Sequence, residues 1–226
     1  MKGTQDIYFN QLNGIRFVAV FLVLMDHWLV LIMPFPTGHL GVVIFFVLSG
    51  FLITRILFES ADEVRTQQAS PWRKLGRFVF RRSLRIFPIY YVVLLVGLIF
   101  QISNFKEIWP WLLSYTPNLY MMWKGTWLGV WDHLWSLAVE EQYYLVFPYF
   151  ILFVKKGNYK WLFFSMIGIG LISRFFFFAY NDHDYIENRY MVSNVNPLNA
   201  LDCFGLGGML AYVFHYQPKN FIGLTK

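Results

Sequence analysis

The stretch IFPIYYVVLLVGLIFQI, residues 86–102, decides the fold class, because it is a long apolar run without a single charged residue. A helix needs about 20 mostly apolar residues to cross the roughly 30 Å hydrocarbon core of a bilayer, within a range of about 17–25. Five further stretches of similar character lie on either side of it: residues 15–33, 40–58, 133–154, 161–180 and 198–214. The sequence therefore predicts an all-α polytopic transmembrane helix bundle with six spans.

The composition of the chain excludes most other classes of protein. Hydrophobic residues make up 57% of the 226 residues and charged residues only 14%, against about 25% charged in soluble proteins. The chain is therefore too apolar to be disordered, and a chain of this size lacks the interior volume to bury so much apolar surface as a soluble globule. The single cysteine, Cys203, excludes a disulfide scaffold.

The net charge of +6 reflects membrane topology rather than nucleic-acid binding. With the N-terminus in the cytoplasm, 15 of the 19 Lys and Arg residues fall at the cytoplasmic ends of the six predicted spans, as the positive-inside rule requires. Residues 109–123 are uncharged but short, and Pro110 and Pro117 interrupt them. We expect a short interfacial or re-entrant segment there; if it crossed the bilayer, every later loop would change sides.

The first predicted span carries three ionisable residues, which are costly inside a membrane and usually mark a site. Arg16 and His27 are eleven residues apart, which is about three helical turns, so both lie on one stripe about 16 Å apart along the axis. A neutral histidine can accept a proton from a hydroxyl, although it can also be a hydrogen-bonded core residue. Asp26 either orients His27 or pairs with another helix.

Two more clusters are candidates for function. Arg81, Arg82 and Arg85 precede the third span, and the i, i+3 pair Arg82 and Arg85 could clamp a phosphate at the cytoplasmic end; the same residues could simply set topology. Glu140 lies inside the fourth span, on one helical face with His133, Ser136 and Tyr144. It could be an acid/base group, a partner for Arg or His, or a hydrogen-bond anchor.

The last span combines a carboxylate with small residues. Asp202 is followed by Gly205, Gly207 and Gly208, and small residues let helices approach closely in membranes. We expect these glycines to serve helix packing.

Five motifs in order resemble the membrane acyltransferase-3 family. They are Asn13-Gly-Ile-Arg16 followed, after ten intervening residues, by His27, GVVIFFVLSGFLI at 41–53, RRSLRIFPIYY at 81–91, WSLAVEEQYY at 135–144 and LDCFGLGGMLA at 201–211. Asn13 stands where the family usually has Asp. Members usually have more spans and more residues, so residues 1–226 are expected to form a single transmembrane domain that is incomplete relative to the family and truncated at its C-terminus.

The resemblance implies an enzyme of the inner (plasma) membrane that transfers an acyl group, commonly acetyl, from cytoplasmic acyl-CoA to a sugar hydroxyl. The acceptor would be O-antigen, exopolysaccharide, a glycolipid or peptidoglycan. His27 would be the catalytic histidine, as a general base or an acyl carrier, with Arg16 as a functional partner. Arg82 and Arg85, together with Arg81, would face the donor, and Glu140 would belong to the site. Acetyl-CoA would be a substrate; no metal or permanently bound cofactor is predicted.

Two other functions are compatible with the same residues. Asp26, His27, Glu140 and Asp202 could form the relay of a proton-coupled transporter or channel. The chain could also be a catalytically inactive fragment or an assembly partner.

Overall fold

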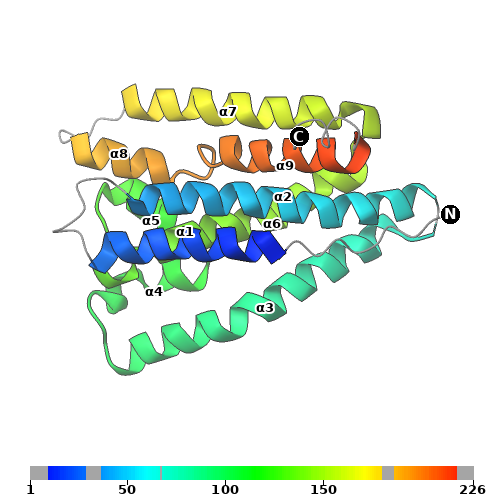
Figure 1. Cartoon of the computed structure of the whole chain (residues 1–226). Helices are drawn as coiled ribbons and strands as arrows, with labels where there is room; N and C mark the ends of the chain where they lie inside the picture. The colour runs from blue at the N-terminus through cyan, green and yellow to red at the C-terminus, as the bar shows by residue number, and fades with distance from the viewer. Residues whose placement is uncertain (1–9, 29–36, 67, 180–185, 218–226) are drawn as a thin grey trace.

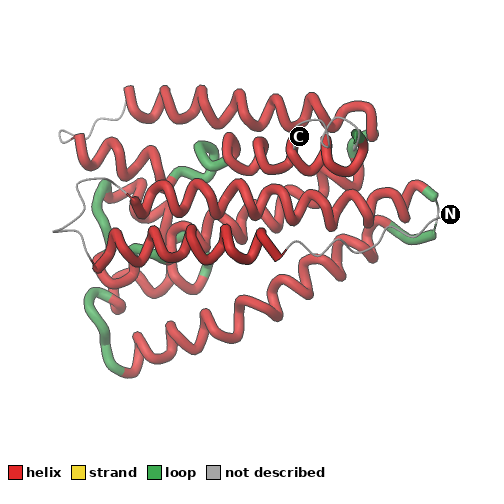
Figure 2. Tube along the Cα trace, in the orientation of Figure 1, coloured by secondary structure: helices red, strands yellow, loops and turns green. Residues whose placement is uncertain are grey.

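The computed structural model describes residues 10–28, 37–66, 68–179 and 186–217. Helices and turns make up this described part, and no strand occurs in it (Figure 2). The long helices are α1 (Asn10–Trp28), α2 (Thr37–Arg65), α3 (Pro71–Ile99), α6 (Leu134–Phe153), α7 (Tyr159–Ala179) and α9 (Leu201–Tyr216). The short ones are α4 (Phe105–Leu113), α5 (Pro117–Lys124) and α8 (Ile186–Val195), with 3-10 turns at Gly129–Trp131 and Lys156–Asn158. The predicted all-α bundle is confirmed.

The six long helices run back and forth, so that consecutive ones point in opposite directions (Figure 1). Within the described residues, three segments are long and apolar enough to cross a bilayer by length and composition: α2, α3 and Lys156–Phe177, which contains most of α7. The crossing of α1, α6 and α9 stays a prediction, and residues 29–33 of the first predicted span lie outside the described part of the chain.

The region of residues 109–123 forms two short helices rather than a span. Helices α4 and α5 have 9 and 8 residues, or about 12–14 Å each, and the chain turns between them at Tyr115, whose φ is 56°. Helix α3 ends and α6 begins at the same end of the bundle (Figure 1). This arrangement agrees with the expected interfacial or re-entrant segment and does not reverse the later helices.

Helix α2 lies at the centre because glycines let its neighbours approach closely. A Cβ on Gly50 would lie 2.5 Å from the carbonyl oxygen of Phe204, and one on Gly207 would lie 2.1 Å from that of Val47. Helices α2 and α9 are therefore in backbone contact. Gly205 lies close to Met166 and Ile167 of α7, and Gly208 lies against the Phe163 ring of the same helix. The packing role predicted for these three glycines is therefore confirmed.

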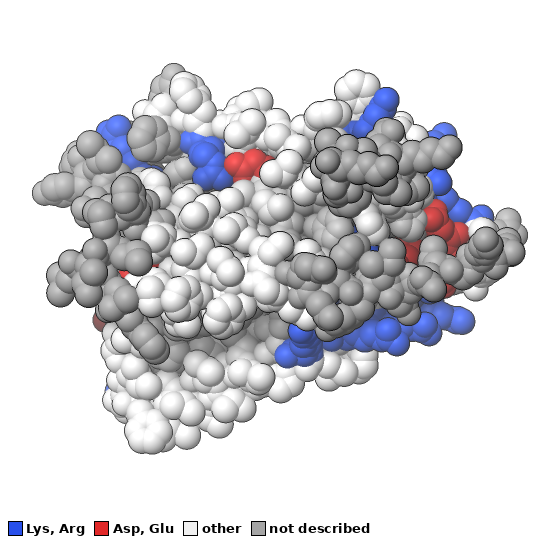
Figure 3. Space-filling view, in the orientation of Figure 1, with Lys and Arg blue, Asp and Glu red and all other residues white. Residues whose placement is uncertain are grey.

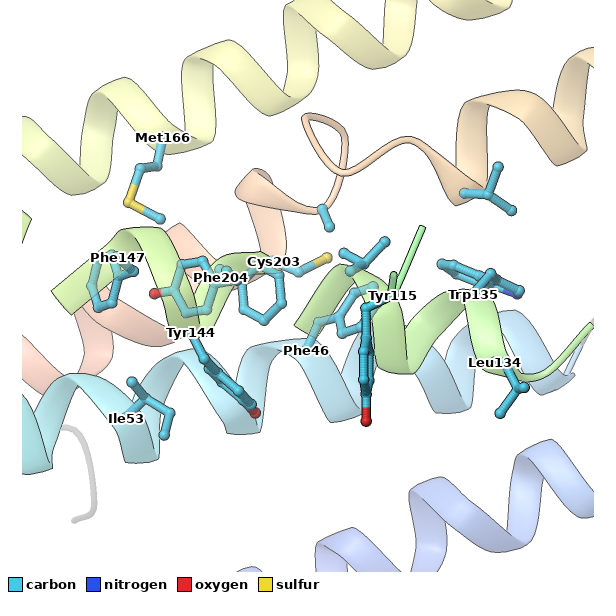
Figure 4. Close-up of a cluster of buried hydrophobic side chains, with 14 of the residues drawn as sticks. Phe46, Ile53, Tyr115, Leu134, Trp135, Tyr144, Phe147, Met166, Cys203 and Phe204 are labelled. Carbon is cyan, nitrogen blue, oxygen red and sulfur yellow. The ribbon is translucent and has the colours of Figure 1, made fainter. Parts of the chain in front are cut away.

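Aromatic rings fill the space between α2, α6 and α9. Phe46 of α2 stacks near Phe204 of α9, with ring centroids 5.0 Å apart, and meets the edge of Trp135 of α6 at 6.1 Å. Figure 4 shows these rings turned into one core. This packing sets the rotation of α6 about its axis, and so determines the direction in which the face that carries Glu140 points.

Candidate active site

Glu140 is a buried carboxylate held by two hydroxyl groups. Its side chain lies on α6 with only 4% of the residue exposed. The Ser49 hydroxyl of α2 donates a hydrogen bond to Oε1, and the Tyr144 hydroxyl, one turn further along α6, donates a second at 2.8 Å. A buried charge must be paired and hydrogen-bonded to be tolerated, so these contacts explain how the carboxylate is accommodated.

Two arginines complete the surroundings of Glu140. The Arg82 guanidinium of α3 lies over the ring of Tyr144, 4.4 Å from its centroid, which is a cation–π distance. The charges of both Arg82 and Arg16 act on Glu140. Helices α1, α2, α3 and α6 therefore bring Arg16, Ser49, Arg82 and Glu140 to one polar centre, which we call the arginine–carboxylate centre.

Polar atoms at this centre lack partners within the described protein. The Nε atom of Arg82 and the Oε1 atom of the neighbouring Glu141 are both buried without a hydrogen bond. The charges of Arg82 and Glu140 also act on Glu141. Nearly all buried polar groups in proteins are hydrogen-bonded, so the unpaired N–H of Arg82 is a donor that a bound anion could use.

The other arginines of this helix are placed differently. Arg81 and Arg85 are exposed, whereas Arg82 is half-buried against α6. Figure 3 shows Lys and Arg side chains gathered on the lower edge of the molecule, toward the end where α3 begins. Of the three predicted donor-binding arginines, the structure brings only Arg82 into the arginine–carboxylate centre.

Asp26 lies near the opposite end of α1, beside a cavity. The Thr37 hydroxyl donates to Oδ1 of Asp26 at 3.4 Å, and Gly38 leaves room for the carboxylate, since a Cβ there would lie 2.6 Å from Oδ2. The cavity has a volume of about 350 Å³ and is also lined by residues of α2, of α6, of α8 and of the chain before α6. Asp26 thus belongs to this cavity and not to the arginine–carboxylate centre.

His27 follows Asp26 in the backbone of α1, and its side chain lies outside the described part of the structure. Its position along α1 is nevertheless fixed by the helix. It is about 16 Å from Arg16 along the axis and next to the residue that lines the cavity. Helix α1 therefore connects the arginine–carboxylate centre at Arg16 with the cavity at Asp26.

Sequence reasoning missed the partners of several polar residues. Ser49 lies inside an apolar motif, and nothing in its spacing pointed to Glu140. Asp202 accepts hydrogen bonds from Arg174 of α7 at 2.8 and 3.1 Å, and Arg174 also donates to the carbonyl oxygen of Asn199 at 3.0 Å. This ion pair gives Asp202 a structural role between α7 and α9.

Comparison with known proteins identifies the family. The profile of a family described as an acyltransferase domain matches residues 9–225. The chain belongs to the acyltransferase-3 family. Together with its apolar helices, this membership makes it a multi-pass membrane protein.

Several curated proteins resemble this acyltransferase-3 chain. The peptidoglycan O-acetyltransferase OatA of Listeria monocytogenes is 33% identical over 188 residues, which are 74% of this chain and 28% of that protein. A Staphylococcus aureus protein provisionally named an O-acetyltransferase is 31% identical over 194 residues, 74% of this chain and 29% of that protein. An uncharacterised protein of Haemophilus influenzae is 30% identical over 209 residues, 81% of this chain and 78% of that protein.

The chain thus spans less than a third of the length of the two O-acetyltransferase relatives. No solved structure matches this acyltransferase-3 chain.

Proposed function

We propose that this protein is a membrane O-acetyltransferase that moves an acetyl group from cytoplasmic acetyl-CoA to a hydroxyl of a cell-envelope carbohydrate. Family membership and the names of the relatives support acyl transfer to a cell-wall carbohydrate. One structural observation carries the finer proposal. The buried arginine–carboxylate centre and the cavity at Asp26 lie at two levels of the same helix, α1, so donor and acceptor can approach from opposite ends.

The donor end is assigned from charge. Acetyl-CoA carries phosphate groups, and arginine binds phosphate with paired N–H donors. Arg82 offers a buried and unpaired N–H, and the exposed Arg81 and Arg85 lie within one turn of it on α3. In this proposal Arg81 and Arg85 attract the donor from the cytoplasm, while Arg82 binds it at the arginine–carboxylate centre.

The reaction is assigned to His27, which lies on α1 at the acceptor end, next to Asp26. The imidazole takes the proton of the acceptor hydroxyl, the hydroxyl oxygen attacks the thioester carbonyl carbon, and the carbon–sulfur bond breaks. The CoA thiolate leaves and receives the proton. If the acetyl group first moves to the imidazole itself, the same residue carries both halves of the transfer.

Glu140 and Asp26 receive separate roles in this proposal. Glu140 offsets the charges of Arg16 and Arg82, since both charges act on it. Asp26 belongs to the acceptor end, because it lines the cavity and directly precedes His27. The transporter alternative is weakened by the Arg174–Asp202 ion pair, since a relay would need the Asp202 carboxylate to exchange protons freely.

The test is transfer of labelled acetyl from acetyl-CoA to envelope glycans in membranes that contain this chain. We expect His27→Ala to lower the transfer rate by at least about 100-fold, because a positioned general base contributes about 10²–10⁴-fold. His215→Ala is the matched control, since His215 pairs with Asp62 at the far end of α2 and α9. Normal transfer by His27→Ala, at equal amounts of membrane-inserted protein, would refute the proposal.

A further inference from the structure

Two hollows adjoin at the end of the bundle where α1 ends. The first is the cavity of about 350 Å³ at Asp26, and the second, of about 420 Å³, lies between α7 and α8. They share the lining residues His39, Tyr190 and Asn194. Each is within the size range of small-molecule sites, about 300–1,000 Å³, and together they form one two-chamber recess.

The first chamber offers the surfaces that a sugar ring needs. Trp127 and Tyr190 are 48% and 41% exposed, so their ring faces are accessible to a ligand. Asp26, Ser136 and Asn194 add carboxylate, hydroxyl and amide groups to the same lining. A pyranose has apolar C–H faces that pack on aromatic rings and hydroxyl groups that hydrogen-bond to such side chains.

The second chamber continues away from α1 toward α7. His39 contacts the Tyr190 ring at 5.7 Å between centroids, and this pair lies where the two chambers meet. Beyond it the lining consists of Leu171, Arg174 and Phe175 of α7 together with Ser193 of α8. Arg174 is held in place by Asp202 and the Asn199 carbonyl oxygen, so this wall is fixed.

We propose that the recess is the acceptor site and that it binds two linked sugar units, the reacting unit beside Asp26 and a neighbouring unit between α7 and α8. This inference rests on the proposed function and adds the size of the acceptor to it. A single sugar occupies only the first chamber. A disaccharide also fills the second, and a third unit extends beyond the recess.

Binding can be measured without catalysis, by calorimetric titration of the detergent-solubilised full chain with N-acetylglucosamine and its β-1,4-linked disaccharide and trisaccharide. We expect the Kd to fall about tenfold from the monosaccharide to the disaccharide, a difference of about 1.4 kcal/mol. We expect almost no further change for the trisaccharide. Equal Kd values for all three sugars, or no binding of any of them, would overturn the proposal.

Two pairs of variants locate the chambers. Leu171→Trp fills the second chamber and should abolish the gain from the second sugar, whereas Ile172→Trp, on the adjacent and 72% exposed position, should keep it. Trp127→Ala should weaken the binding of every sugar, whereas Trp123→Ala, also exposed but outside the recess lining, should not. If Leu171→Trp kept the difference in Kd between the monosaccharide and the disaccharide, the two-unit site would be overturned.

The outcome is separable from that of the proposed function. Sugar binding with this size dependence but without acetyl transfer would leave the recess in place and refute the O-acetyltransferase assignment. Acetyl transfer that is lost in His27→Ala but unchanged in Leu171→Trp would refute the two-unit recess and leave the proposed function in place.

Discussion

At the scale of single residues, the structure separates two arginines that the sequence treats alike. Arg82 and Arg85 share an i, i+3 spacing, but Arg82 lies over Tyr144 beside Glu140, and Arg85 is exposed. We expect Arg82→Lys to raise the KM for acetyl-CoA by about tenfold, because lysine cannot reproduce the planar stacking and forked N–H donors of arginine. An exposed Arg85→Lys keeps its point charge and should change the KM by less than about threefold.

Steady-state kinetics with acetyl-CoA as the varied substrate provide the measurement, with thermal unfolding as a check that both variants fold. Equal effects of the two substitutions would show that Arg82 has no special place in donor binding. A large effect of Arg85→Lys alone would place the donor site on the exposed face of α3 around Arg85.

Much of the arginine–carboxylate centre could be predicted from residue type. Arg16, Arg82 and Glu140 are charged residues within or beside apolar segments, and such residues usually have a function. The contact of Ser49 with Glu140 could not be predicted, because the two residues are 91 positions apart and a serine in an apolar helix is common. The Arg174–Asp202 pair was missed for the same reason, because a separation of 28 positions carries no pairing signal.

At the scale of helices, the contact between α2 and α9 depends on Gly207. An added Cβ would meet backbone atoms of α2, 2.1 Å from the Val47 carbonyl oxygen and 2.7 Å from the Phe51 nitrogen, and backbone cannot move aside as a side chain can. We expect Gly207→Ala to destabilise the protein by about 1–3 kcal/mol, the usual cost of overpacking, measured by thermal unfolding in detergent.

Gly168→Ala on α7 is the matched control for Gly207→Ala. A Cβ at Gly168 meets nothing within 4 Å, and alanine favours helix over glycine by about 0.8–1.0 kcal/mol. The control should therefore unfold at the same temperature or slightly higher. A Gly207→Ala protein as stable as this control would contradict the backbone contact.

The helix boundaries show where sequence patterns stop being informative. The apolar run predicted residues 86–102 for the third span, yet α3 begins at Pro71. The segment before the run carries six basic residues between positions 73 and 85, so its hydropathy is too low for it to be predicted as part of the span. In contrast, the fourth span was predicted as 133–154 and α6 is Leu134–Phe153, since apolar residues extend to both of its ends.

At the scale of the whole molecule, the long helices alternate in direction (Figure 1), and the two ends of the bundle differ in chemistry. Basic side chains gather toward one end, and the two-chamber recess lies at the other. If the basic end faces the cytoplasm, as the distribution of Lys and Arg predicts, acetyl-CoA and the acceptor are on opposite sides of the membrane. In the proposed function, the acetyl group therefore crosses the bilayer through this protein.

The most direct measurement supplies labelled acetyl-CoA, which does not cross membranes, to vesicles of defined orientation. Inside-out vesicles expose the cytoplasmic face to added acetyl-CoA, and we predict that label then reaches glycan enclosed in the vesicle lumen. Right-side-out vesicles given the same acetyl-CoA should label no glycan, and His27→Ala should label none in either orientation. Equal labelling in right-side-out vesicles, or labelling of lumenal glycan by His27→Ala, would contradict transfer across the membrane through His27.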